Sequence, residues 1–337
     1  MSSGNILEVK NLHLGFQAAK SAKGSVQTIP ILRGLNFNLA YGEALGIVGE
    51  SGSGKSVTSF AIMDLLPEYA RVQGDISLFG RPWLTASLSE KNQLRGSKIA
   101  MIFQDPLSSL DPCFTIEEQI AEVIRLHTST PTEQVQDKVI QALEQVGIPD
   151  PHSRLKAYPH QLSGGMCQRI MIAMALAGEP ELIIADEPTT ALDVTIQKQI
   201  LDLLQKLRQE KNLSMILISH DLGLVAENVD RLAVMYAGEI VEMGSVRQIL
   251  KNPQHPYTAS LLNSLPSHYH ELNKNFRIPV MKGVVPNLAN RPVGCQFHPR
   301  CEYAQESCRQ GEIALNSNGV RCLFPLTKLN TEMDSLL

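Results

Sequence analysis

Hydrophobic residues follow two different patterns along the first two thirds of the chain. Residues 6–9 and 35–39 alternate between apolar and polar side chains, and this period of two predicts half-buried antiparallel strands. Residues 17–28 between them are polar and predict a long hairpin loop. Four further runs are apolar throughout, which predicts strands of a buried, mainly parallel sheet. They are residues 44–48, 99–103, 182–185 and 215–218.

Helical patterns dominate residues 105–180. Thr130 is a candidate N-cap, with Pro131 at the first helical position and Glu133 at the third. Apolar side chains every three or four positions over 135–146 mark one buried helix face, and a similar stripe follows in a helix predicted over 194–210. The pattern weakens after residue 255 and prolines become frequent. We therefore predict a first domain over 1–254, with a helical subdomain at about 105–180, and a C-terminal extension over 255–337.

Composition limits the class of protein. A chain of 337 residues with 43% hydrophobic and 19% charged residues is typical of a globular protein with an ample core. The net charge of −4 and the lack of a Lys/Arg run argue against a nucleic-acid partner. No basic and apolar leader opens the sequence, so we expect a reducing cytoplasm and no disulfide framework. The longest apolar stretch, 170–178, is too short to cross a membrane, so a membrane role would need a partner.

A glycine-rich segment between an apolar strand and an apolar helix has the spacing G-x-x-x-x-G-K-[ST]. Its glycines let backbone N–H groups face a polyphosphate, and the helix that follows presents its positive end. Lys55 can then reach the β- and γ-phosphates, and the Ser56 hydroxyl can bind Mg²⁺. A chance Gly/Ser loop is the alternative, and the flanking strand and helix make it the weaker one. The predicted phosphate loop is Gly49, Glu50, Ser51, Gly52, Ser53, Gly54, Lys55 and Ser56.

Two adjacent carboxylates end the apolar strand at 182–185. Neighbouring residues of a strand point in opposite directions, so the two acids can take different roles. We expect Asp186 to hold Mg²⁺ and Glu187 to polarise an attacking water molecule. A solvated acidic turn is the alternative, and the presence of a phosphate loop in the same chain disfavours it.

Ser163, Gly164 and Gly165 precede a predicted helix over 166–177. An exposed helix N-terminus is a second place where an anion can bind. Two phosphate-type sites in one chain suggest that two chains share each nucleotide. A Ser-Gly-Gly cap with purely local duties is the alternative reading of this segment.

Taken in order, these segments resemble the motifs of ATP-binding cassette (ABC) ATPases. The resemblance covers residues 49–56, Gln104, 162–168, 186–187, 191–193 and His220. It implies an α/β P-loop core with a mainly parallel sheet, an antiparallel β subdomain and a helical signature subdomain. ATP and Mg²⁺ would be the ligands, and the contacts would extend to Val57, Gly164 and Gln168.

The same resemblance implies roles for three isolated residues. Gln104 would sense Mg²⁺ and the water and touch a membrane partner, and Asp193 would lie at the dimer interface. His220 would act near the γ-phosphate, and it also follows an apolar strand that delivers it to the sheet edge where phosphates bind. Phe16 is the candidate for stacking on adenine.

Several segments are similar, more narrowly, to the dipeptide/oligopeptide importer subfamily: residues 48–58, 101–106, 158–166, 186–195 and 255–258. The similarity implies an ATPase at the cytoplasmic face of the inner membrane. Its partners would be a second ABC ATPase in a heterodimer, two integral-membrane permease subunits and an extracytoplasmic peptide-binding protein. Cys167 departs from the subfamily's usual polar residue, and we expect no effect from it.

Other functions remain open at this point. Nickel or antimicrobial-peptide cargo is possible within the same subfamily. A soluble cassette ATPase acting on nucleic acid or ribosomes predicts basic patches or tandem cassettes, and the sequence has neither. A purely regulatory nucleotide switch would tolerate the loss of Glu187, whose presence argues for hydrolysis.

Four of the six cysteines lie in the extension, separated by 6, 7 and 14 positions: Cys295, Cys301, Cys308 and Cys322. Four thiolates can hold a [4Fe–4S] cluster or a tetrahedral Zn²⁺, and free structural thiols are the third reading. The lack of a C-x-x-C pair disfavours a zinc ribbon. Residues 291–322 resemble the C-terminal tail of the importer subfamily, which implies an iron–sulfur cluster that would staple a loop-rich segment.

Overall fold

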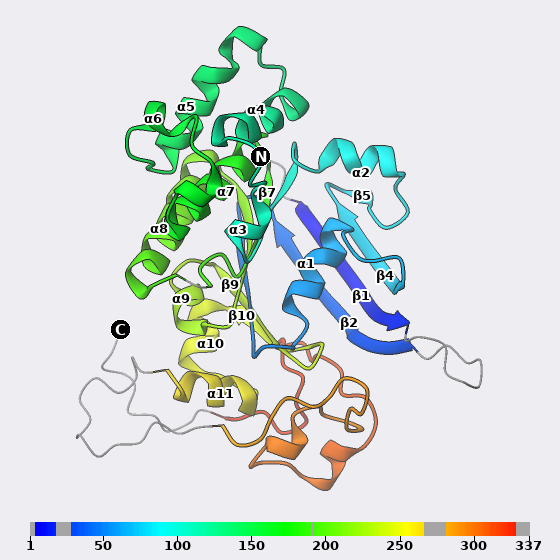
Figure 1. The fold of residues 1–337 in the computed structure, drawn as a ribbon. Helices are drawn as coiled ribbons and strands as arrows, with labels where there is room; N and C mark the ends of the chain where they lie inside the picture. Colours follow the sequence, from blue (N-terminus) through cyan, green and yellow to red (C-terminus); the bar gives the residue numbers. More distant parts are fainter. Residues whose placement is uncertain (1–3, 18–27, 191, 266–280, 328–337) are drawn as a thin grey trace, which may run out of the picture. The chain divides into compact units, whose positions relative to one another are not determined.

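The computed structural model describes residues 4–17, 28–190, 192–265 and 281–327 (Figure 1). The chain divides into two compact units. The first comprises residues 1–7, 39–44 and 77–218, and the second comprises residues 8–38, 45–76 and 219–337. Strands β1 (Asn5–Gln17), β2 (Thr28–Ala40) and β4 (Ala70–Leu78) pass from one unit into the other along the chain.

Parallel strands form the centre of the first unit. β6 (Ile99–Ile102) pairs with β7 (Leu182–Asp186), and β7 pairs with β8 (Ser214–Ser219), both in parallel. All residues of the three strands are buried, as the continuous apolar runs predict. In this register Asp186 lies opposite Ile218, so the two strands bring their carboxyl ends level with each other.

Helices fill residues 105–180, as predicted. They are α3 (Pro106–Ser109), α4 (Ile116–His127), α5 (Val135–Gln145), α6 (Pro151–Arg154) and α7 (Gly164–Ala177), with 3₁₀ turns η1 (Thr132–Gln134) and η2 (Pro159–Gln161). Helices α4, α5 and α7 pack against one another (Figure 1, green). The unit also contains α2 (Leu88–Leu94) and α8 (Val194–Lys211).

One predicted helix start is wrong. Pro131 lies before the 3₁₀ turn η1, and α5 begins only at Val135, without a side-chain cap. The Thr130 hydroxyl hydrogen-bonds to Thr128 Oγ1 at 2.8 Å and does not cap the helix. The Thr-Pro-Thr-Glu sequence therefore leads into a 3₁₀ turn, and the α-helix begins at Val135, the first residue of the buried face of α5.

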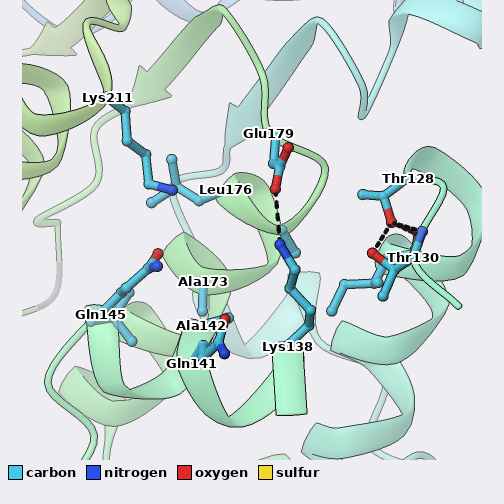
Figure 2. Close-up of a pocket in the computed structure, with 13 residues that line it drawn as sticks. Thr128, Thr130, Lys138, Gln141, Ala142, Gln145, Ala173, Leu176, Glu179 and Lys211 are labelled. Atoms are coloured by element: carbon cyan, nitrogen blue, oxygen red, sulfur yellow. Dashed lines mark hydrogen bonds and ion pairs between the residues drawn. The ribbon is translucent and has the colours of Figure 1, made fainter. Parts of the chain in front are cut away.

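A small pocket lies among the helices of this unit (Figure 2). Its volume is about 50 Å³, and residues of α4, α5 and α7 line it together with Lys211 at the end of α8. Lys138 Nζ lies 3.3 Å from Glu179 Oε1 beside it. None of the residues predicted to bind nucleotide lines this pocket.

The second unit holds two groups of strands. β9 (Arg231–Tyr236) runs parallel to β3 (Ala44–Val48) and antiparallel to β10 (Glu239–Ser245). β1 lies between β2 and β4 in a second sheet. The end of β4 pairs antiparallel with β5 (Arg81–Pro82), and both of these segments belong to the first unit. The helices are α1 (Lys55–Met63), α9 (Leu222–Ala226), α10 (Val246–Lys251) and α11 (Pro256–Asn263).

The alternating patterns at 6–9 and 35–39 are confirmed as strands, although β1 and β2 are longer than the patterns. Residues 18–27, most of the predicted hairpin loop, lie outside the described residues.

The C-terminal extension begins with helix α11 and is otherwise loop-rich in its described residues, as predicted; these include the 3₁₀ turns η4 (His298–Arg300) and η5 (Glu306–Arg309). It also adds a short segment to strand β10. Met243 N donates to Gly319 O at 2.8 Å, and Arg321 N donates to Val241 O at 2.8 Å. Glu242 and Val320 form an antiparallel bridge between them.

Candidate nucleotide site

The glycine-rich segment connects β3 to α1, where the sequence places the phosphate loop. Gly54 immediately precedes the helix with φ 102°, a conformation that favours glycine. A Cβ on Gly49 would lie 2.1 Å from the carbonyl oxygen of Met235, so only glycine fits beside β9. These two positions fix the path of the loop from the buried strand to the helix N-terminus.

Lys55 is almost fully buried, at 4% exposure. Its ammonium Nζ donates to the carbonyl oxygens of Gly49 at 2.9 Å and Glu50 at 3.2 Å. The cation therefore lies against the loop that is predicted to surround phosphate. Ser56 and Val57 follow in the first turn of α1, both half-buried.

The two carboxylates at the end of β7 differ in environment. Asp186 is 2% exposed and is the last residue of the strand. Glu187 follows with φ 46°, a left-handed conformation that is uncommon for a residue with a side chain. Such strain concentrates at functional sites. The Glu187 N–H donates to Ile218 O at 2.9 Å, which ties the turn to β8.

The structure brings Gln104 and Glu187 together. Thr190 Oγ1 donates to Glu187 Oε2 at 2.9 Å, and Gln104 Nε2 lies 3.5 Å from the same oxygen. Sequence reasoning assigned no role to Thr190, although it stands three residues after Glu187 within a quoted motif. This threonine orients the carboxylate.

The signature segment begins a helix, as predicted, but two residues earlier. Ser163 is the N-cap of α7, and its Oγ accepts from Met166 N at 3.3 Å. Asp193 caps α8 in the same way, with Oδ1 accepting from Ile196 N at 3.0 Å. A Cβ on Gly165 would lie 3.2 Å from Ile196 Cγ2, so the two helix N-termini approach closely.

The remaining predicted nucleotide-site residues are placed as follows. Gly164 and Asp193 are exposed, whereas Gln168 is 1% exposed and its Nε2 has no hydrogen-bond partner among the described residues. His220 is exposed directly after β8. Phe16 lies near the end of β1, where its ring packs edge-on against Tyr69 with centroids 5.5 Å apart.

All four cysteines of the extension line one pocket with a volume of about 10 Å³. None forms a disulfide. The pKa of Cys295 is raised to about 11, mainly by burial and also by the neighbouring Cys322, Cys301 and Cys308, because thiolate charges would repel. Within the described ranges, no group of three or more His, Cys, Asp or Glu side chains is placed to hold a metal ion.

His255 lines the same pocket and is 1% exposed. Burial lowers its pKa to about 3, so the ring is neutral at pH 7. Its Nδ1 accepts from Tyr257 N at 3.1 Å, which leaves the proton on Nε2. Nε2 is buried and finds no acceptor in the described part of the chain. The cysteine pocket therefore contains one unsatisfied hydrogen-bond donor.

Comparisons with known proteins match this arrangement. The ABC transporter family matches residues 32–190, and the C-terminal region of the oligopeptide/dipeptide transporter family matches residues 241–308. Among solved structures, the dimeric post-hydrolysis state of the ATP-binding cassette MJ0796 bound to ADP and Pi is similar. Its TM-score is 0.62 and its sequence identity 27%, over 72% of this chain and 99% of that one. The chain belongs to the ABC transporter family and is an ATPase.

Particular relatives narrow this class further. The dipeptide transport ATP-binding protein DppD of Haemophilus influenzae is 48% identical over 96% of each chain. DppD of Escherichia coli is 49% identical over 87% of this chain and 90% of that one. A putative peptide import ATP-binding protein of Brucella melitensis is 44% identical over 98% of each. The resemblance predicted from the motifs is confirmed. No described helix is both long and apolar enough to cross a membrane.

Proposed function

We propose that this chain is the ATP-hydrolysing subunit of an importer of dipeptides or oligopeptides. The observation that carries the proposal is similarity over nearly the full length to proteins named for dipeptide transport, with a C-terminal region of the same transporter type. The chain would work at the cytoplasmic face of the inner membrane. Its partners would be a second ABC ATPase, two integral-membrane permease subunits and an extracytoplasmic peptide-binding protein. We place the ATPase domain at 1–254 and the extension at 255–337.

ATP binds, in this proposal, through the phosphate loop 49–56, with Phe16 stacking on adenine. Lys55 Nζ exchanges the carbonyl oxygens that it now contacts for phosphate oxygens, which are stronger partners because they are charged. The hydroxyl, carboxylate and amide oxygens of Ser56, Asp186 and Gln104 are the ligand types that Mg²⁺ prefers. Bound there, the ion would neutralise phosphate charge.

Glu187 acts as the base that polarises the attacking water. Thr190 and Gln104 both contact the Oε2 atom of its carboxylate, so the carboxylate is already oriented. Ser163, Gly164, Gly165 and Gln168 from a second chain close over the triphosphate, with Asp193 at the interface and His220 beside the γ-phosphate. Closure and reopening of the pair would drive the membrane subunits between inward- and outward-facing states.

Transport by the reconstituted complex tests this function. The chain would be purified with its permease subunits and second ATPase, placed in proteoliposomes and supplied with the binding protein. We expect a dipeptide to stimulate ATP hydrolysis and to accumulate on the side of the membrane opposite the binding protein. If Ni²⁺ or an antimicrobial peptide stimulates ATP hydrolysis and dipeptides do not, the assignment of dipeptides as the cargo is wrong. Failure to copurify with any integral-membrane subunit would contradict a transporter.

We also propose that Cys295, Cys301, Cys308 and Cys322 hold a [4Fe–4S] cluster. Four thiols line one pocket, three of them half-buried and that of Cys308 buried, and they supply the soft ligands that such a cluster needs. The unsatisfied Nε2–H of His255 would donate to a sulfur. A single Zn²⁺ is the alternative; the chain lacks the C-x-x-C pair that is typical of zinc ribbons, and the resemblance of residues 291–322 to the importer subfamily favours the cluster. The pocket's small volume means that thiol side chains would have to reorient on loading. The bound group would supply cross-linking of the extension.

Iron and acid-labile sulfide analysis tests the cluster. Protein purified anaerobically should contain four iron atoms per chain in this proposal, and Cys308→Ser should lose them and lower the thermal unfolding temperature. Cys113→Ser is the matched control, because Cys113 is exposed and far from the other cysteines in the sequence. Stoichiometric zinc without iron would favour the alternative metal, and no metal at all would leave free thiols.

A further inference from the structure

The first variable residue of the phosphate loop is held twice by residues near the C-terminus. The Glu50 backbone N–H donates to the Tyr257 hydroxyl at 2.9 Å. The Glu50 carboxylate Oε1 accepts from Arg300 Nη1 at 2.8 Å. The Arg300 side chain is only 6% exposed, so this ion pair is largely shielded from water on one side. Sequence reasoning gave Tyr257 and Arg300 no role.

Arg300 is itself fixed in place before it reaches Glu50. Its Nε donates to Lys282 O at 2.9 Å, and Nη1 also lies 3.3 Å from the Tyr236 hydroxyl. The guanidinium lies 5.7 Å from the ring of Tyr236 and 5.9 Å from that of Phe297. A stacked and hydrogen-bonded arginine loses little further freedom when it pairs with a carboxylate. The contact to Glu50 is therefore preorganised.

The cysteine pocket and the phosphate loop are connected through this arginine. Arg300 immediately precedes Cys301 in the chain and belongs to η4. Phe297, which contacts the guanidinium, also lines the cysteine pocket. The pocket lining and the Arg300 guanidinium therefore share Phe297 as a neighbour.

We propose that Arg300 is a positioning residue for ATP binding, which holds the start of the phosphate loop through Glu50. The proposal rests on the assignment of ATP to residues 49–56. A loop rich in glycine loses much conformational freedom when it closes around phosphate, and a loop already held at one end loses less. Arg300 contacts the loop and not the reacting groups that we assign. Its loss should therefore weaken nucleotide binding and raise KM, with kcat little changed.

A purely structural role for the pair predicts something different. If the Arg300–Glu50 contact only anchored the extension, its removal would lower the unfolding temperature without a selective change in nucleotide affinity. Arg309 supplies the matched control. It lies in the same extension and pairs with Glu306 at 3.5 Å, but both side chains are exposed.

The test measures MgATP affinity, KM and kcat for the full-length chain in its purified complex, with variants R300Q, E50Q, R300K, R309Q and the double variant R300Q/E50Q. We expect R300Q and E50Q each to raise Kd and KM about tenfold, in line with loss of a charge-assisted hydrogen bond. Because both changes remove the same contact, the double variant should be no worse than either single one. R300K should recover part of the affinity, and R309Q should match the wild type.

Two outcomes overturn the inference: nucleotide affinity of R300Q equal to that of R309Q, or losses from R300Q and E50Q that add in the double variant. Thermal unfolding of each variant separates misfolding from weak binding, and R300K, which keeps the charge, supplies a folded arginine-free form. Lys55→Ala tests the underlying assignment independently. If K55A binds MgATP as tightly as the wild type, the assignment of the nucleotide site is wrong. If K55A loses affinity but R300Q binds MgATP like the wild type, only the positioning role of Arg300 is wrong.

Discussion

Glu187 shows at the scale of one residue how this chain stores strain where chemistry is expected. Its φ of 46° is uncommon for a residue with a side chain, and β8 and Thr190 hold it there. Strain of this kind costs of the order of 1–3 kcal/mol and persists only where neighbours enforce it. The turn places one carboxylate oxygen in contact with Thr190 and Gln104, so the side chain would already be oriented for the proposed reaction.

We predict that Glu187→Gln keeps nucleotide affinity within about twofold and lowers the turnover of ATP by at least about a hundredfold, because the amide keeps the shape but cannot accept a proton. Single-turnover hydrolysis and equilibrium binding of MgATP measure the two effects. Glu181→Gln is the control, because Glu181 lies at the other end of β7 in a surface ion pair with Lys98. Normal hydrolysis by the Gln variant would refute the assignment of the base.

Side-chain contacts between residues far apart in the sequence could not be predicted for individual residues. The motifs placed Lys55, Asp186, Glu187 and Ser163 at the ends of strands and helices, because local spacing determines those positions. Arg300 reaches Glu50 across 250 residues, and no periodicity or spacing signals such a pair.

At the scale of secondary-structure elements, helix α4 carries a complete capping box. Thr115 Oγ1 accepts from Glu118 N at 3.3 Å, and Glu118 Oε2 accepts from Thr115 N at 2.8 Å. The Thr115 hydroxyl also donates to this carboxylate, and these hydrogen bonds hold the pKa of Glu118 below its usual value of 4.5. The charged form of Glu118 is therefore more stable in the folded chain than in the unfolded one.

This shift has a definite sign. A depressed pKa contributes stability above the usual value of 4.5, and that contribution is lost as the pH falls through the lower folded-state pKa. We predict that the unfolding temperature of the wild type falls more steeply below pH 4.5 than that of Glu118→Gln, which keeps an acceptor oxygen but does not titrate. Glu122→Gln, exposed on the same helix, is the control. Parallel profiles for wild type and E118Q would contradict the prediction.

Element positions were predictable where burial imposes a period. The four apolar runs became β3, β6, β7 and β8, because a strand covered on both faces needs apolar residues throughout. Helix ends were less predictable. Thr130 was expected to cap a helix, but a 3₁₀ turn follows it instead. Ser163 does cap a helix, which begins two residues earlier than expected.

At the scale of the whole molecule, the exposed N-termini of α7 and α8 are the surfaces that a second chain would meet under the proposed mechanism. Ser163 and Asp193 lie at these N-termini in the first unit. Both side chains already accept one backbone N–H, so the caps keep the helix ends ordered without a ligand.

We predict that MgATP drives the Glu187→Gln chain into a two-chain assembly with its partner ATPase, and that adding Ser163→Ala prevents this. Ser245 is a matched cap, since its Oγ accepts from Gln248 N at 3.3 Å, the same distance as in α7. Both Ser→Ala changes should cost about 1 kcal/mol of stability. Light scattering after size exclusion measures the assembly. Equal loss of pairing in both variants, or in neither, would argue against the shared site.

The short segment around Val320 has a consequence for anyone who shortens this chain. It hydrogen-bonds to Met243 and Val241 and so occupies backbone groups on the side of β10 that does not face β9. A strand with bare donors and acceptors invites the same strand of another molecule to add to it. Truncation before residue 319 would expose that edge of β10. The shortened protein would then self-associate even though every nucleotide-site residue is intact.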